Sequence, residues 1–425
     1  MSKFTKSQTK RNILFAGLQI IASGLTLFIL YKYLVTTLGV ELIGVWSIVM
    51  AFSAFLRTGD FGFAGSIVKF VSVATVKNDT QKREEIISTS LTSVAVVLGV
   101  LLILFYPIII YILPFFIEAK YINLAIELLP YSLVSVWLAV LSTLIIFIFD
   151  GINRVDIRSS FLITFNIILV VLSITMVNFF GFIGLGYAQV LQAFLQLVIA
   201  WILIKKHILL SFTIPNRWNK RIFKEIFSYS IHLQLSSLMA MMLEPISKLM
   251  LGYFGSMSSV GYFEMANRLV MQVRNIIVNA NQALVPMLSK AHEESKDIGK
   301  HYTLTLKVLF VVSLFVYSLV GLLSSFISQI WIGSYEEVFV YYSYIILLTM
   351  FINTLAGAAY FTNMGTGDVN YNTYSQIIIA VVNVLLGIVL GYFYNDIGVV
   401  LAYGISIIIG SCWLIYNFNQ RKRFT

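Results

Sequence analysis

The sequence predicts an all-α polytopic membrane protein with about 12 transmembrane helices in two six-helix bundles. Hydrophobic residues make up 59% of the 425-residue chain, and charged residues make up only 11%. Apolar runs long enough to cross a bilayer recur along the whole chain, and lysine and arginine collect in short clusters between them. This composition is typical of a chain whose solvent is mostly lipid.

Apolar segments define the expected membrane crossings, because a spanning helix needs about 20 mostly apolar residues. The segments of this kind are 13–38, 42–74, 86–113, 121–149, 158–180, 184–204, 229–251, 260–288, 303–330, 338–362, 373–394 and 397–418. The first follows a basic stretch, as a signal peptide does, but it is too long for one and lacks a small-residue cleavage site. We therefore expect it to remain as the first helix.

Basic residues set the expected topology. An even number of crossings places both termini on one side, and the tails and loops of that side hold 21 of the 29 basic residues. These are Lys3, Lys6, Lys10, Arg11, Lys77, Lys82, Arg83, Arg154, Arg158, Lys205, Lys206, Arg217, Lys220, Arg221, Lys224, Lys290, Lys296, Lys300, Arg421, Lys422 and Arg423. The opposite loops hold only Lys120. Because positive loops stay in the cytoplasm, we expect a multi-pass protein of the bacterial inner (cytoplasmic) membrane with both termini cytoplasmic.

The longest loop, 205–228, separates two halves with related glycine patterns. It divides the chain into an expected N-terminal six-helix bundle, 1–210, and an expected C-terminal six-helix bundle, 211–425. Glycines correspond between the halves at offsets of 216 or 217 early and 214 later, as Gly39 does to Gly255, Gly44 to Gly261 and Gly184 to Gly398. An even number of helices per half makes this a parallel repeat, with a substrate site expected between the halves.

The same loop carries an apolar helical stripe among cations, formed by Trp218, Ile222 and Ile226. Such a stripe is typical of an interfacial helix that lies on an anionic leaflet. The alternative is a plain linker between the two halves.

Residues that usually carry catalysis or metal binding are sparse. The single cysteine, Cys412, excludes a disulfide framework and a cysteine metal site. The histidines lack metal-ligand spacing, and the chain has no Gly-rich phosphate loop followed by Lys and Ser or Thr. We therefore expect no enzyme activity, no cofactor and no metal. Topology explains the net charge of +10, so we expect no nucleic acid partner.

The chain resembles the Wzx-type O-antigen and polysaccharide flippases. The six-plus-six arrangement carries the resemblance, together with the run Arg57 to Phe63 before a basic loop and the glycine-containing entries near 184 and 398. These flippases belong to the multidrug/oligosaccharidyl-lipid/polysaccharide (MOP) exporter superfamily, which also holds the MATE exporters and the peptidoglycan lipid flippase MurJ. The resemblance implies a V-shaped pair of helical bundles and a central cavity lined mainly by the first, second, seventh and eighth helices.

The resemblance also implies a function and partners. The expected activity is to flip an undecaprenyl-diphosphate-linked oligosaccharide, an O-antigen or capsule repeat unit, across the cytoplasmic membrane by alternating access. The expected partners are this lipid-linked oligosaccharide, membrane lipids, and polysaccharide polymerase and chain-length proteins. The alternatives are a MATE-like ion-coupled small-molecule exporter and a membrane-embedded polysaccharide polymerase or ligase. The short external segments disfavour the last of these.

Charged residues inside the expected spans are costly and usually face a cavity or one another. The basic ones are Lys32, Arg57, Lys69, Lys248, Arg268, Arg274 and Lys307, and the acidic ones are Asp60, Glu244 and Glu264. The basic excess suits an anionic diphosphate. Three couples can also neutralise themselves at helical spacing, namely Arg57 with Asp60, Glu244 with Lys248, and Glu264 with Arg268. Asp60, Glu244 and Glu264 are the candidate ion-coupling sites.

The segment 260–288 carries the largest polar face. Its polar residues cover about half of the helical wheel. They are Glu264, Asn267, Arg268, Gln272, Arg274, Asn275, Asn279, Asn281 and Gln282. This half must contact water, substrate or another polar helix, and amide side chains both donate to and accept from sugar hydroxyls. The alternative is hydrogen bonding between helices with no ligand.

Arg274 is the strongest candidate for contact with the diphosphate. It lies deep in its span and has no acidic residue three or four positions away. Lys248 and Arg268 are expected to support it, with Lys32 and Arg57 as further basic candidates. The candidate sugar ligands are Asn267, Asn275, Asn279 and Gln282.

Overall fold

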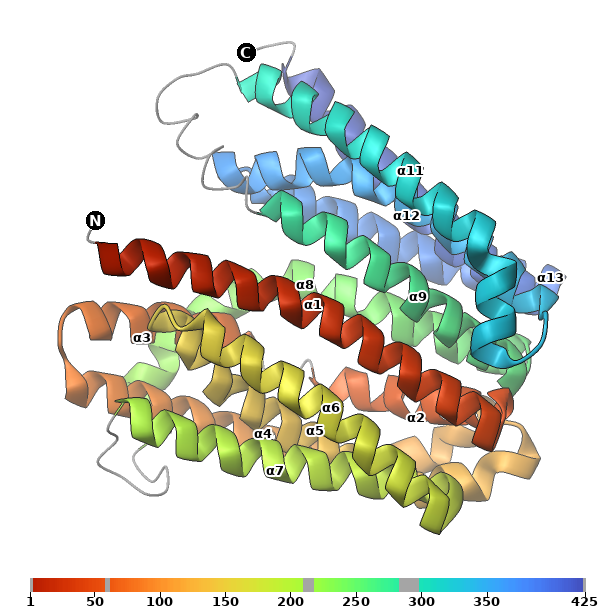
Figure 1. Cartoon of the computed structure of the whole chain (residues 1–425), viewed down its shortest axis with the longest axis horizontal. Helices are drawn as coiled ribbons and strands as arrows, with labels where there is room; N and C mark the ends of the chain where they lie inside the picture. Colours follow the sequence, from red (N-terminus) through yellow and green to blue (C-terminus); the bar gives the residue numbers. More distant parts are fainter. Residues whose placement is uncertain (1–2, 58–61, 209–217, 283–297, 423–425) are drawn as a thin grey trace. The chain divides into compact units, whose positions relative to one another are not determined.

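A computed structural model of the chain describes residues 3–57, 62–208, 218–282 and 298–422. Within these ranges the chain is helical and contains no strand, which confirms the predicted all-α class (Figure 1). The α-helices are α1 (Lys3–Leu38), α2 (Val40–Arg57), α3 (Phe63–Val76), α4 (Thr80–Ile112), α5 (Ile122–Gly151), α6 (Val155–Phe180), α7 (Gly184–Ile208), α8 (Lys220–Phe254), α9 (Met257–Gln282), α11 (Ile298–Ile332), α12 (Glu337–Thr366) and α13 (Val369–Lys422). Short 3-10 helices are η2 (Leu113–Phe115), η3 (Ala119–Tyr121) and η4 (Gly181–Ile183).

Seven stretches of the described chain are long and apolar enough to cross a membrane, and two of these stretches each contain two helices. Val155–Ile208 contains both α6 and α7, and Val369–Arg421 contains two helices that meet at Asn395, whose φ is 52°. Each of these stretches is more than 50 residues long. At about 1.5 Å per residue such a length exceeds twice the roughly 30 Å of a hydrocarbon core. The protein is therefore a multi-pass membrane protein.

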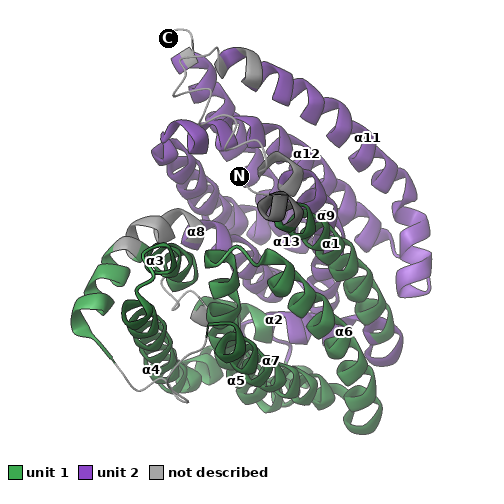
Figure 2. Ribbon diagram, turned by 60° about the vertical axis from the view of Figure 1, so that its left-hand side comes forward, with its two compact units in different colours: residues 1–33, 49–114, 119–235 green, residues 34–48, 115–118, 236–425 purple. Residues whose placement is uncertain are grey.

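The described chain forms two compact units, coloured green and purple in Figure 2. Unit 1 consists of Met1–Tyr33, Val49–Pro114 and Ala119–Leu235, and unit 2 consists of Leu34–Ile48, Phe115–Glu118 and Ser236–Thr425. Helices α1, α2 and α8 contribute residues to both units. The division of the sequence into bundles at 210/211 stays a prediction.

The core of unit 1 lies among α3, α4, α5, α6, α7 and the first turns of α8. Ile67 of α3, Ile87 of α4 and Phe149 of α5 are fully buried there, together with Ile226 of α8. Helix α5 is central, since it packs against α3, α4, α6 and α7. Close van der Waals packing of these side chains holds the helices together, because lipid tails are as apolar as the side chains themselves and give no hydrophobic driving force between helices.

The core of unit 2 lies among α9, α11, α12 and α13. Helix α12 packs against the other three, and Figure 1 shows α9, α11 and α12 side by side. Phe263 of α9 and Tyr403 of α13 meet edge to face, with ring centroids 5.3 Å apart. This packing fixes the position of α9, the helix with the large polar face.

Large apolar side chains stand exposed along α4 and α11. They include Ile103 and Tyr111 of α4 and Val311, Phe315 and Leu322 of α11, each more than 60% exposed. In water such a surface would be unfavourable, whereas in a bilayer acyl chains cover it. These faces therefore lie against lipid.

The stripe at 218–226 is not a separate interfacial helix, so that prediction was wrong. Helix α8 begins at Lys220 and continues to Phe254. Ile222 and Ile226 are buried in the core of unit 1, and Trp218 donates a hydrogen bond to Ser93 Oγ at 2.9 Å. Ile222 and Ile226 pack against protein and not lipid, although Trp218 is 50% exposed, and a helical pattern alone cannot distinguish these environments.

Backbone features recur at the spacing that the sequence repeat predicts. Gly181, which ends α6, and Asn395, at the bend of α13, lie 214 residues apart and both have positive φ, 60° and 52°. Three residues later, a Cβ at Gly184 or at Gly398 would overlap the carbonyl oxygen of the residue eight positions earlier. The α6 to α7 connection and the bend of α13 are thus the same structural element.

Residues that correspond in the repeat also contact each other within unit 2. At an offset of 217, Ser258 Oγ donates to Glu41 Oε1 at 3.3 Å, and Ser47 Oγ donates to Glu264 Oε2 at 3.0 Å. Added Cβ atoms at Gly44 and Gly261 would overlap carbonyl oxygens of α9 and α2, respectively. Small residues allow this close backbone approach. Contact between equivalent residues is what a two-fold pseudo-axis produces.

Candidate functional site

Helices α8 and α9 hold a cluster of four charged side chains in unit 2. Lys248 Nζ lies 2.5 Å from Glu244 Oε1 and also pairs with Glu264 Oε2. Arg268 Nε donates to Glu264 Oε1 at 2.7 Å, and its Nη2 lies 3.5 Å from Glu244 Oε1. Two carboxylates and two cations therefore balance each other. We call these four residues the ion cluster.

The ion cluster has a buried side and an exposed side. The side chains of Lys248 and Glu264 are 5% and 3% exposed, whereas those of Glu244 and Arg268 are 27% and 41% exposed. Ser47 of α2 adds its hydrogen bond to Glu264. Each cation therefore pairs with the carboxylate four positions earlier on its own helix and also with a carboxylate of the other helix. Removing one member of such a buried set leaves an uncompensated charge, which costs about 3 to 5 kcal/mol.

Arg274, further along α9, has a different environment from that of Arg268. Its Nε and Nη2 donate to Asn353 Oδ1 of α12 at 3.1 and 2.8 Å. Asn353 Nδ2 donates in turn to Ser411 Oγ of α13 at 3.0 Å. No carboxylate of the described residues lies within ion-pair distance of Arg274. A neutral amide therefore orients the guanidinium without cancelling its charge.

A cavity of about 320 Å³ adjoins Arg274. Polar side chains line it from three helices, namely Asn353 and Tyr360 of α12, Ser375, Gln376 and Ser411 of α13, and Arg274 itself. Ser375 Oγ donates to the carbonyl oxygen of Gly410 at 2.9 Å. The cavity thus combines a positive charge with hydroxyl and amide groups, which suits an anionic and hydroxyl-rich ligand.

The other predicted amide ligands are not gathered at this cavity. Asn267 is buried on α9, where its Oδ1 accepts from Tyr403 at 3.2 Å, so it joins helices instead of facing a ligand. Asn275 is exposed on α9. The side chains of Asn279, Asn281 and Gln282, in the last turn of α9, lie outside the described residues.

Of the three remaining charged candidates, the structure describes the side chain of one. Lys32 of α1 is exposed in unit 1. The side chain of Arg57, at the end of α2, and the whole of Asp60 lie outside the described residues. Among the residues described, no group of three or more His, Cys, Asp or Glu could hold a metal ion.

Sequence reasoning missed Asn353, Tyr360, Gln376 and Ser411. Asn353, Tyr360 and Ser411 stand in mostly apolar stretches, and Gln376 lies in the polar beginning of its helix, so no pattern sets these four residues apart from their neighbours. The one available signal was Asn353, an amide within a span that needs a hydrogen-bond partner in a bilayer. Its partner could not be inferred, because that depends on how α9, α12 and α13 pack.

Known structures share this fold. An inward-facing multidrug resistance MATE family transporter of the MOP superfamily superposes with a TM-score of 0.76 at 16% identity, covering 96% of this chain and 98% of that one. Lipid II flippase MurJ in an inward closed conformation gives a TM-score of 0.76 at 18% identity, with coverage of 96% and 87%. A MOP superfamily transporter from Pyrococcus furiosus, described by the reverse polarity of its binding pocket, gives 0.66 at 17% identity, with coverage of 96% and 95%.

These similarities define the class as a multi-pass membrane protein with the MOP superfamily fold. The sequence itself matches the family model described as "Polysaccharide biosynthesis protein" over residues 9–292, about two thirds of the chain. The chain belongs to this family, which confirms the resemblance seen in the sequence. A comparison with curated proteins gave no match.

Proposed function

We propose that this protein flips an undecaprenyl-diphosphate-linked oligosaccharide, an O-antigen or capsule repeat unit, across the bacterial inner membrane. The observation that carries the proposal is Arg274, whose charge is oriented by Asn353 and not cancelled by a described carboxylate. A guanidinium can donate two parallel hydrogen bonds to a phosphate, and a diphosphate is the charged part of such a lipid. Membership of a polysaccharide biosynthesis family supports the oligosaccharide part of the proposed substrate.

The ion cluster has a different proposed role. Because its charges are balanced, Lys248 and Arg268 would support a diphosphate only after releasing a carboxylate. Glu244, the more exposed carboxylate, would then be the group that an ion or proton reaches first. In this proposal Glu244 and Glu264 couple transport to an ion gradient, with Asp60 as a third candidate. If neutralising all three left transport and its response to ionophores unchanged, the coupling would be excluded.

The test of function is complementation in a strain that lacks the gene. Without the protein, sugar-lipid intermediates should accumulate on the inner leaflet, and the wild-type gene should clear them. Arg274→Gln should fail to clear them, with transport reduced about 10- to 100-fold, the equivalent of one lost charge-assisted contact. Arg274→Lys should recover part of the activity, because it restores charge without the planar fork.

The matched control is Lys307→Gln on α11, which removes an exposed charge of another span. It should clear the intermediates as the wild type does, and both variants should insert to the same level. Full clearance by Arg274→Gln would overturn the diphosphate assignment. Resistance to cationic drugs on expression in a sensitised strain would favour the exporter alternative instead.

A further inference from the structure

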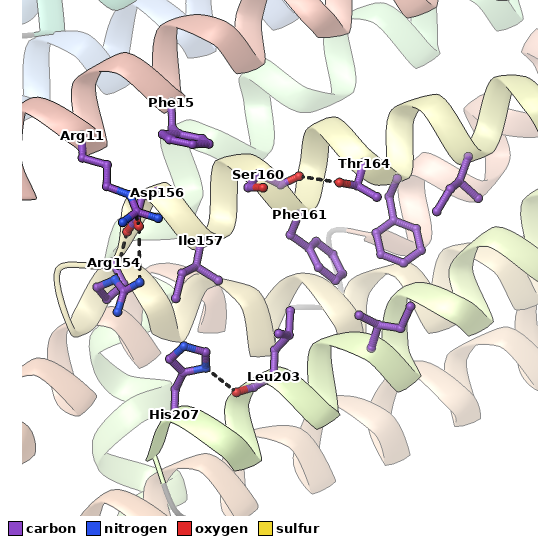
Figure 3. Close-up of a pocket in the computed structure, with 13 residues that line it drawn as sticks. Arg11, Phe15, Arg154, Asp156, Ile157, Ser160, Phe161, Thr164, Leu203 and His207 are labelled. Atoms are coloured by element: carbon purple, nitrogen blue, oxygen red, sulfur yellow. Dashed lines mark hydrogen bonds and ion pairs between the residues drawn. The ribbon is translucent and has the colours of Figure 1, made fainter.

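Unit 1 contains a second cavity, of about 370 Å³, whose lining is more apolar than that of the cavity beside Arg274. It lies among α1, α6 and α7 (Figure 3). Charged side chains gather at one end, where Arg11 and Arg154 meet Asp156. Aromatic and aliphatic side chains line the rest, including Phe15, Phe161 and Ile168.

The polar end presents two arginines that are held in place by one carboxylate. Asp156 is 1% exposed, and its oxygens accept from Arg11 Nε at 3.0 Å, Arg154 Nε at 3.0 Å and Gln8 Nε2 at 2.9 Å. Two cations against one anion leave a net charge of +1. The side chains of Arg11 and Arg154 remain 57% and 34% exposed, so their outer nitrogens are accessible to an anion. Asp156 therefore orients the pair without neutralising it.

The apolar end is a stripe on one face of α6. Ile157, Phe161, Phe165 and Ile168 follow helical spacing, and the rings of Phe161 and Phe165 lie 4.5 Å apart. The stripe from first to last residue is roughly 16 Å long, at about 1.5 Å per residue. That length is close to one leaflet, half of a hydrocarbon core of about 30 Å. Ile199 of α7 forms part of the opposite wall and is 38% exposed.

The depth of the charged end also matches a lipid. Arg154 immediately precedes α6, and His207 lies in the last turn of α7 beside Lys205 and Lys206. Basic residues at the ends of spanning helices lie in the head-group region, and a stripe that starts there runs into the hydrocarbon. One phosphate near the arginines and one acyl chain along the stripe would fill both ends of the cavity.

We propose that this cavity binds one anionic phospholipid, its phosphate on Arg11 and Arg154 and an acyl chain along α6. The site is separate from the proposed transport cavity, since it lies wholly in unit 1. It would tie α1 to the α5–α6 connection through a lipid as well as through Asp156. Lipid binding here can be measured whether or not the protein is a flippase.

The experiment titrates the delipidated, detergent-solubilised full chain with dioleoyl phosphatidylglycerol and detects bound lipid by native mass spectrometry. The wild type should show one saturable, tight adduct. Removing the charged set together, as Arg11→Gln with Arg154→Gln and Asp156→Asn, should weaken it at least tenfold without leaving a buried charge unpaired, as expected for lost charge-assisted bonds. Arg11→Gln alone should weaken it less, because the guanidinium of Arg154 can still donate a hydrogen bond to the phosphate.

Two further variants distinguish a lipid site from a simple anion site. Asp150→Asn with Arg158→Gln removes a neighbouring ion pair outside the cavity, 2.8 Å long, and should leave binding unchanged. Ile199→Trp fills the apolar end and should weaken lipid binding while all charges remain. The proposal is overturned if the charge-neutral variant binds as the wild type does. It is equally overturned if inorganic phosphate displaces the lipid and Ile199→Trp has no effect, because the cavity would then bind any small anion.

Discussion

Two polar sites on α9 differ in how their charges are compensated. In the ion cluster, the positive charges of Lys248 and Arg268 are balanced by Glu244 and Glu264. The side chains of Lys248 and Glu264 are almost fully buried. Further along the helix, Arg274 donates to the neutral amide oxygen of Asn353 and has a cavity beside it. We call the balanced ion cluster the closed site, and Arg274 with Asn353 and the adjoining cavity the open site. Helix α9 thus contributes to one neutral site and one positive site.

This difference separates structural charge from charge available to a ligand. A balanced cluster can hold helices in register, because each charge already has the opposite charge that it needs. An arginine oriented by a neutral group keeps its electrostatic attraction for an anion. The amide of Asn353 is therefore as informative as the arginine itself. We expect substitutions at the closed site to lower stability and substitutions at the open site to lower transport.

The largest expected effect is on the closed site, in Glu264→Gln. This change leaves Lys248 and Arg268 facing only Glu244, with one buried positive charge uncompensated. We expect a loss of about 3 to 5 kcal/mol in stability. Thermal unfolding of the detergent-solubilised protein would measure it as a lower melting temperature. The matched control Glu337→Gln, at an exposed position in the first turn of α12, should lower the melting temperature only slightly, because it loses at most about 1 kcal/mol of interaction with the helix N-terminus.

A compensating change sharpens this test. Lys248→Met together with Glu264→Gln removes one charge of each sign, and the remaining pair is Glu244 with Arg268. Stability should recover relative to Glu264→Gln alone, because no buried charge is left without its partner. If the double variant were no more stable than the single one, charge balance would not be what holds the cluster.

Next in size is Gly44→Ala, which tests whether the closed site depends on the close approach of α2. An added Cβ would overlap the carbonyl oxygen of Met257, so α2 must move away from α9 and carry Ser47 away from Glu264. Overpacking of this kind costs about 1 to 3 kcal/mol. Melting temperatures again provide the measurement.

Gly17→Ala on α1 is the matched control, since a Cβ there meets nothing within 4 Å. It should be neutral or slightly stabilising, because alanine is the better helix former. Equal losses in the two variants would mean that the glycine at 44 has no special packing role.

Some contacts of the two sites could be predicted from the sequence, and others could not. The couples at i and i+4 were readable because helical spacing alone brings them together, and the structure confirms the pairs Glu244 with Lys248 and Glu264 with Arg268. The link from Lys248 to Glu264 was not readable, because it depends on the register of α8 against α9. The depth of Arg274 and its lack of a neighbouring acid were readable, whereas its partner Asn353 lies 79 residues away.

The fold was more predictable than the site. Long apolar runs dictate helices in a bilayer, since backbone groups must be satisfied within the segment. The glycine pattern predicted the repeat, and the positive φ of Gly181 and Asn395 shows where its connections bend. The stripe at Ile222 and Ile226 was misread, because apolar periodicity does not say whether lipid or protein covers it.

Giving Arg274 a carboxylate partner would make the charge of the open site balanced, as it is in the closed site. We expect this change to have a small effect on stability and a clear effect on transport. Asn353→Asp places a carboxylate where the amide oxygen now accepts from Arg274 at 2.8 Å. Ser411 can donate to the new carboxylate, so its hydrogen bond is kept. Stability should be unchanged or higher, while clearance of sugar-lipid intermediates should fall about tenfold as the positive charge is cancelled. Undiminished clearance would contradict an electrostatic role for Arg274.

The smallest effect is expected at an exposed pair of unit 2, Arg421 with Asp368, which is a third case beside the closed and open sites. Arg421 Nη1 lies 3.0 Å from Asp368 Oδ2, and Asp368 is 55% exposed. Arg421 also donates to Asn363 at 2.9 Å and stacks on Tyr371 at 3.6 Å, so it keeps partners when the carboxylate is lost. Water solvates both charges, and exposed pairs contribute at most about 1 kcal/mol. Asp368→Asn should therefore lower the melting temperature slightly at low salt and not measurably at high salt, where screening already weakens the pair. A loss as large as that of Glu264→Gln would show that exposure does not govern how much these ion pairs contribute to stability.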